Sequence, residues 1–150
     1  HNTLKPLFLQ YGKQFANLGE GAPVNPDLSY PFQLSSWWVN YQKQTEFNPI
    51  HTHGGVYSFV IWMKIPTDWK KQNLRNKSNS HCISAFQFHY TNILGEMINY
   101  DYELNSKHEG MMVFFPSQLF HAVYPFYDCD EDRISVSGNI SLNTTKGRPK

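Results

Sequence analysis

Short segments in which apolar and polar residues alternate recur along the chain between residues 35 and 142. In Arg133–Leu142, the clearest of them, apolar residues fall on one face and Arg133, Ser135 and Ser137 fall on the other. A period of two is that of a β-strand with one buried face. Several such strands at spacings of roughly 8–12 residues, separated by turn signals, favour a sandwich or a barrel. We therefore predict an all-β core.

The other predicted strands are bounded by proline, glycine and asparagine. Pro66 ends one of them because proline cannot donate a hydrogen bond to a sheet ladder. The turn Asn92–Gly95 joins two others as a hairpin. These strands are Ser35–Gln44, Val56–Ile65, Ile83–Tyr90, Glu96–Leu104 and Met111–Pro116.

The chain is predicted to form one domain, because 150 residues suffice for one core and no linker divides them. Apolar residues at near-helical spacing predict a short helix within Leu4–Leu18, followed by an irregular segment that completes an N-terminal flank over residues 1–35. The core covers residues 36–142, and a polar tail covers residues 143–150. Thr67–Ser80 is predicted to be a solvated loop, with a basic lip over an anionic substrate as the alternative.

Composition excludes several classes of partner. The net charge is +1, so overall electrostatics favours neither nucleic acid nor membrane. No apolar run approaches the ~20 residues of a membrane-spanning helix. No signal peptide is recognisable, so a cytoplasmic location is expected. Cys82 and Cys129 lie in no metal or redox motif, and free thiols are expected rather than a disulfide.

Histidines supply the candidate metal ligands. His51 and His53 stand two positions apart, just before the most apolar run of the chain. In an extended chain such side chains point to the same side, with backbone positions roughly 7 Å apart, so they can converge on one ion. His121 follows a strand and a turn that return the chain to the same end, and His89 is the reserve candidate. Three imidazoles, or two with a carboxylate, leave open positions on an octahedral ion.

Arg133 and Ser135 are the candidate anion site, because they share one strand face. The planar guanidinium of arginine suits a carboxylate in bidentate geometry. Burying an unpaired arginine inside a barrel would cost free energy, so this arginine is expected to bind an anion. The alternative is a surface ion pair with one of the nearby acidic residues, Asp130, Glu131 or Asp132.

The order and spacing of these motifs resemble the iron(II)- and 2-oxoglutarate-dependent dioxygenases, and within them a small branch of uncharacterised bacterial and phage proteins. The likeness covers about residues 36–142. It rests on four motifs, which are Trp38-Val-Asn40, His51-Thr-His53 leading to a strand that ends at Pro66, Gly110 to His121 with Phe115-Pro-Ser117 inside it, and Arg133-Ile-Ser-Val-Ser-Gly-Asn139.

The resemblance implies a double-stranded β-helix, or jelly roll, that holds Fe(II) at one mouth. His51, His53 and His121 would be the metal-binding and catalytic residues, and Arg133 with Ser135 would bind the distal carboxylate of 2-oxoglutarate. The implied reaction consumes O2, converts 2-oxoglutarate to succinate and hydroxylates a substrate that the sequence does not identify. A homodimer is one option for the assembly, and a phage-encoded chain would work in the host cytoplasm.

One departure from the wider family leaves alternatives open, because that family has Asp or Glu where this chain has His53. All-histidine ligation is preferred. Otherwise His53 is the first ligand and Gly55 takes the carboxylate position, as in halogenases, or Asp101 or Glu46 supplies a carboxylate. Two other functions compete. One is a cupin-like three-histidine metal protein that does not use 2-oxoglutarate, although the Glu expected after His53 is missing. The other is a non-catalytic jelly-roll module for binding or structure.

Overall fold

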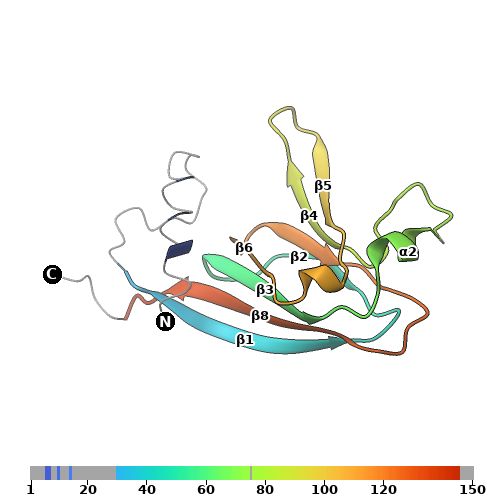
Figure 1. Cartoon of the computed structure of the whole chain (residues 1–150). Helices are drawn as coiled ribbons and strands as arrows, with labels where there is room; N and C mark the ends of the chain where they lie inside the picture. Colours follow the sequence, from blue (N-terminus) through green and yellow to red (C-terminus); the bar gives the residue numbers. More distant parts are fainter. Residues whose placement is uncertain (1–5, 8–9, 11–13, 15–29, 75, 146–150) are drawn as a thin grey trace.

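Two four-stranded antiparallel sheets face each other in the computed structural model of the chain, which describes residues 6–7, 10, 14, 30–74 and 76–145 (Figure 1). One sheet has the strand order β1-β8-β3-β6 and the other has the order β2-β7-β4-β5. This arrangement confirms the predicted all-β jelly roll. The strands are β1 (Phe32–Gln42), β2 (Asn48–His51), β3 (Tyr57–Lys64), β4 (Phe86–Thr91), β5 (Met97–Tyr102), β6 (Met112–Pro116), β7 (Phe120–Val123) and β8 (Arg133–Leu142).

Strand β8 lies between β1 and β3, and its register decides which side chains enter the sandwich. Ser135 is paired with Asn40 of β1 and with Trp62 of β3. Paired residues share a face, and residues two apart along a strand share it too. Because Trp62 belongs to the buried core, the polar face of β8, with Arg133 and Ser135, turns inward. Alternation separated the two faces of β8 but did not show which of them is inside.

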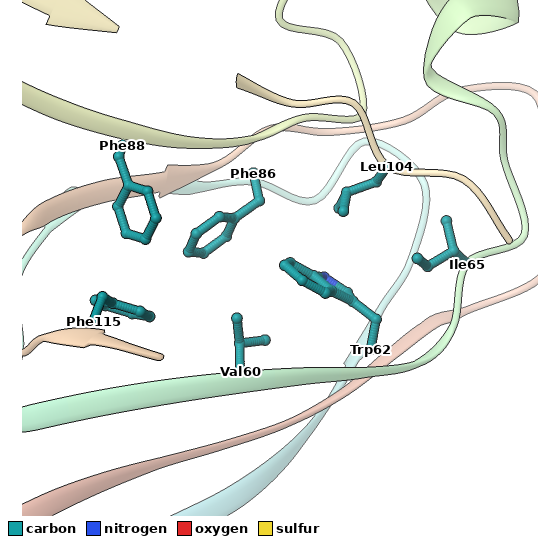
Figure 2. Close-up of a cluster of buried hydrophobic side chains, with 7 residues drawn as sticks. All are labelled: Val60, Trp62, Ile65, Phe86, Phe88, Leu104 and Phe115. Atoms are coloured by element: carbon teal, nitrogen blue, oxygen red, sulfur yellow. The ribbon is translucent and has the colours of Figure 1, made fainter. Parts of the chain in front are cut away.

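The main core fills one part of the space between the sheets. Figure 2 shows side chains of β3 pointing toward aromatic side chains of β4, with an aromatic ring of β6 beside them. Burying one such side chain stabilises the fold by about 1.5–3 kcal/mol, so this cluster fixes the distance between the sheets. Its members are Val60, Trp62, Ile65, Phe86, Phe88, Leu104 and Phe115.

The predicted loop Thr67–Ser80 is wrong in one part, because it contains the helix α2 (Trp69–Asn73). The Asp68 carboxylate caps that helix by accepting a hydrogen bond of 3.0 Å from the Lys71 N–H. A short 3-10 helix, η1 (Ser106–His108), follows β5. The helix predicted within Leu4–Leu18 lies mostly outside the described residues.

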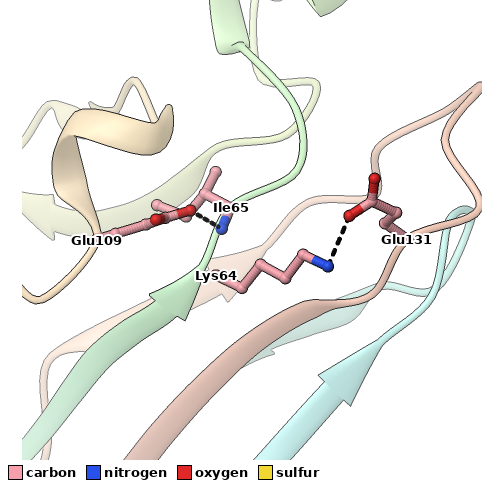
Figure 3. A network of polar contacts seen from close by, with 4 residues as sticks. All are labelled: Lys64, Ile65, Glu109 and Glu131. Atoms are coloured by element: carbon pink, nitrogen blue, oxygen red, sulfur yellow. Dashed lines mark hydrogen bonds and ion pairs between the residues drawn. The ribbon is translucent and has the colours of Figure 1, made fainter.

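The end of β3 is held by two acidic side chains (Figure 3). The Glu109 carboxylate accepts a hydrogen bond of 2.8 Å from the Ile65 N–H, just before Pro66. The Lys64 ammonium lies 2.6 Å from the Glu131 carboxylate. This hydrogen bond raises the pKa of Lys64 and lowers the pKa of Glu131. Both side chains are exposed, so the pair contributes little stability.

Both cysteines are free and half-buried, as predicted for Cys82 and Cys129. In the part of the chain that the structure describes, no helix is long and apolar enough to cross a membrane.

The turn between the histidine pair and β3 depends on Gly55. Its φ is +102°, and a Cβ placed on it would lie 2.6 Å from the Ile140 carbonyl oxygen. We expect Gly55→Ala to lower the free energy of unfolding by about 1–3 kcal/mol, measured by urea unfolding. Gly54→Ala is the matched control, since a Cβ there meets nothing within 4 Å. Equal stability of the two variants would contradict the strain assigned to Gly55.

Candidate metal centre

The three candidate histidines lie on neighbouring segments of one sheet. His51 is the last residue of β2, His53 follows two positions later, and His121 is on β7. His51 is paired with His121 across the β2–β7 ladder. One ligand nitrogen from each histidine lies within 4.8 Å of the others. The structure therefore brings together the three imidazoles that the sequence nominated.

Backbone carbonyls orient two of the rings. The Nδ1 atom of His51 lies 2.6 Å from the Pro49 carbonyl oxygen, and Nδ1 of His121 lies 2.9 Å from the Leu119 carbonyl oxygen. A carbonyl oxygen only accepts, so each Nδ1 carries the proton and each Nε2 presents a lone pair. Hydrogen bonds of this kind hold metal-binding imidazoles in their tautomer and ring orientation.

The spacing of His53 and His121 also suits one ion. Their Nε2 atoms are 3.1 Å apart. Two nitrogens bound at about 2.1 Å with a right angle between them would lie about 3.0 Å apart. The two rings can hydrogen-bond to each other, with His53 as donor, or turn both lone pairs to a shared ion.

A neutral imidazole is the form that binds a metal, and burial favours that form for His53 and His121. It lowers the pKa of His121 to about 4, with nearby imidazoles adding to the shift and the Leu119 hydrogen bond opposing it. Burial, followed by the effect of His51, also lowers the pKa of His53. The His121 ring packs against the rings of Phe86 and Phe115, at centroid distances of 5.6 and 5.0 Å.

A cavity of about 610 Å³ opens between the sheets and contains both predicted sites. Its wall includes the three histidines together with Arg133 and Ser135. Cavities of roughly 300–1,000 Å³ hold small-molecule ligands. The inner face of β1 completes the wall with Trp38, Asn40 and Gln42.

Arg133 is buried, with 2% of its surface exposed, and its guanidinium is bonded to neutral oxygens. Gln42 Oε1 accepts from Nε at 2.9 Å and from Nη2 at 2.7 Å. The Ser84 carbonyl accepts from Nη1 at 2.9 Å, and the Tyr124 carbonyl accepts from Nη2 at 2.7 Å. The Phe126 ring lies 5.3 Å from the guanidinium carbon.

The predicted alternative of a surface ion pair for Arg133 is wrong. Glu131 pairs with Lys64 instead, and no carboxylate among the described residues pairs with Arg133. Burial lowers the pKa of Arg133 to about 10, so the side chain is still a cation at neutral pH. A buried cation beside a cavity and without a counter-ion is suited to an anionic ligand.

The alternative ligands lie elsewhere. Asp101 accepts a hydrogen bond of 2.7 Å from Gln87, and Glu46 lines the cavity but accepts from the Lys43 N–H at 2.8 Å. Neither carboxylate belongs to the histidine cluster. His89 alternates with the core residues of β4, so it points away from the cavity and lies 2.8 Å from Asn99. None of residues 67–74 or 76–80 lines the cavity, so the basic lip has no support here.

Comparison with protein-family models identifies the family. The model described as "Putative 2OG-Fe(II) oxygenase" matches residues 36–139. The chain belongs to this oxygenase family. Membership implies Fe(II), 2-oxoglutarate, O2 and a substrate. The donor set of the chain fits that expectation, because three imidazoles and a buried guanidinium share one cavity. A search of curated proteins found no match to the chain.

Sequence reasoning missed the residues that surround Arg133. Residues two apart along a strand share a face, so the sequence places Gln42 on the same face as Trp38 and Asn40, but no motif gives it a role. Ser84 and Tyr124 act through backbone carbonyls, which leave no signal in the type of side chain.

Proposed function

We propose that this chain is an Fe(II)- and 2-oxoglutarate-dependent oxygenase that hydroxylates a substrate still to be identified. The observation that carries the proposal is the cavity itself. Three imidazoles converge on one point of its wall, and a buried cation without a counter-ion lies on another.

In this proposal His51, His53 and His121 hold the metal through their ring nitrogens. The Pro49 and Leu119 carbonyls keep two Nδ1 protons in place, so the metal meets lone pairs without prior ring rearrangement. When bound, the iron supplies the activation of O2 that couples conversion of 2-oxoglutarate to succinate and CO2 with oxidation of a C–H bond.

Arg133 and Ser135 receive the distal carboxylate of the co-substrate in this proposal. The guanidinium supplies charge and paired N–H donors, and the Ser135 hydroxyl lies on the same face of β8. Asn40 donates to Ser135 Oγ at 3.3 Å, which leaves the hydroxyl proton available to the carboxylate.

Aromatic side chains line the cavity around the histidines. The Trp38 ring lies 5.6 Å from the His53 ring, and Phe86 and Phe115 border His121 on the inside. Apolar walls of this kind limit the access of water and strengthen electrostatic contacts with a bound dianion.

Calorimetric titration with 2-oxoglutarate tests the proposal. We expect binding in the presence of Mn(II) and none in metal-free protein, since the co-substrate needs both the ion and Arg133. With Fe(II) and O2, succinate should then form. A cupin-like protein would bind Mn(II) but not 2-oxoglutarate, and a non-catalytic module would bind neither, so either result would overturn the proposed function.

A further inference from the structure

Gln42 occupies the edge of Arg133 that a carboxylate would use. One amide oxygen accepts from both Nε and Nη2, at 2.9 and 2.7 Å. A carboxylate bound side-on to arginine takes the same two donors with its two oxygens. The Gln42 amide oxygen therefore occupies the place on Arg133 that a carboxylate group of the proposed ligand would take.

Among the described residues, Gln42 supplies the one close side-chain acceptor of the guanidinium, since the other side-chain oxygen, Ser84 Oγ, lies 3.5 Å from Nη1. The Ser84 and Tyr124 carbonyls belong to the backbone. The backbone of each residue is held in place by its own N–H group, since the Ser84 N–H donates to the Pro125 carbonyl oxygen at 2.8 Å and the Tyr124 N–H donates to the Ala85 carbonyl oxygen at 2.9 Å. Ser84 also adopts a left-handed conformation, with φ of 64°, and is completely buried. Gln42 is half-buried and borders the cavity.

The Gln42 amide also has a second set of partners outside the guanidinium. Its Nε2 donates to the Glu46 carbonyl oxygen at 2.6 Å, in the turn between β1 and β2. Gln42 thus connects that exposed turn with the buried cation. Release of Oε1 from Arg133 requires no change in either sheet.

We propose that Gln42 is a replaceable internal ligand of Arg133, which the distal carboxylate of 2-oxoglutarate displaces when it binds. This inference rests on the proposed function. The Arg133 cation attracts a negatively charged carboxylate more strongly than a neutral amide oxygen, and two carboxylate oxygens can take its two donors in parallel, so the exchange favours the dianion. Until then the amide satisfies a buried cation that would otherwise be costly to maintain. Gln42 is a specificity-determining residue that a ligand without a carboxylate would fail to displace.

Two variants of Gln42 test this exchange in the Mn(II)-loaded chain. Gln42→Glu is nearly isosteric and gives Arg133 a permanent carboxylate partner, so 2-oxoglutarate affinity should fall at least tenfold. Gln42→Ala removes the competing oxygen, so affinity should equal or exceed that of the natural chain. Gln33→Glu is the matched control, because it adds the same charge at the exposed far end of β1, where Gln33 lies 3.4 Å from Ser141.

Thermal unfolding without 2-oxoglutarate supplies a second readout. Gln42→Glu should raise the melting temperature of the metal-loaded protein and abolish the further rise that 2-oxoglutarate produces in the natural chain. The inference is overturned if Gln42→Glu binds 2-oxoglutarate like the natural chain, or if Gln42→Ala loses binding at least tenfold. If the natural chain shows no metal-dependent binding, the proposed function itself fails, and the exchange fails with it.

Discussion

Replacing His121 with alanine is expected to weaken Mn(II) binding by more than about 100-fold, since loss of groups that merely orient a ligand already costs 10–100-fold. His121 is the most buried of the three histidines, and its ring lies within 5 Å of both other rings, at 4.2 Å from His51 and 4.9 Å from His53. No other imidazole in the described residues replaces it in the cluster. The measurement is calorimetric titration with Mn(II), supported by thermal unfolding with and without the ion.

The matched control for this loss is His89→Ala. His89 is also buried, at 7% exposure against 3% for His121, and it lies one residue from the partner of His121 on β4. Its ring is on the opposite face of the sheet, so the affinity for Mn(II) should be unchanged. If Mn(II) raises the melting temperature of His89→Ala but not that of His121→Ala, then His121 acts as a metal ligand and the loss of binding is not a consequence of lower stability.

His51→Ala and His53→Ala then decide among the ligand sets that the sequence left open. All-histidine ligation predicts a loss of Mn(II) affinity in both variants, because each ring contributes one nitrogen to the cluster. Unchanged binding in His51→Ala would leave His53 and His121 as the ligands. The third position would then be open, as in the halogenase arrangement.

Local sequence patterns predicted the parts of the site that depend on residue spacing along a strand. Alternation along β8 placed Arg133 and Ser135 on one face, and the two-residue spacing of His51 and His53 placed their rings on one side. The first outcome follows from the geometry of a strand, which is insensitive to distant residues. His53 lies two positions beyond the last residue of β2, so the approach of its ring to that of His51, at a centroid distance of 5.0 Å, is not set by strand geometry alone. The helix α2 lacked such a pattern, because five residues with a single Asp68 cap show no clear helical period.

The environment of Arg133 could not be predicted in the same way, because it depends on contacts between distant segments. The pairing of Gln42 with Arg133 joins residues 91 positions apart through the β1–β8 register. The Ser84 carbonyl reaches the guanidinium from a residue with φ of 64°, a conformation that serine does not signal. The sequence pattern identified Arg133 and its strand face, but only the folded chain shows which groups accept hydrogen bonds from its guanidinium.

Replacing Arg133 with methionine should lower the affinity for 2-oxoglutarate by about 100-fold or more, because truncating one partner of a buried charge pair removes most of its binding energy. Binding of Mn(II) should persist, since Arg133 does not belong to the histidine cluster. Stability should fall by about 1–3 kcal/mol, because the Ser84 and Tyr124 carbonyls lose a buried donor. Calorimetry and urea unfolding measure the two effects separately.

Two further variants separate charge, geometry and position in this prediction. Arg133→Lys keeps the cation but lacks the planar fork, so it should recover only part of the 2-oxoglutarate affinity. Lys64→Met removes a cation from the neighbouring strand β3, where the side chain is 44% exposed and paired with Glu131 (Figure 3). That control should bind 2-oxoglutarate normally, because solvent screens the exposed pair. Normal binding in Arg133→Met as well would remove the guanidinium from the co-substrate site and leave the three histidines as a metal centre of another kind.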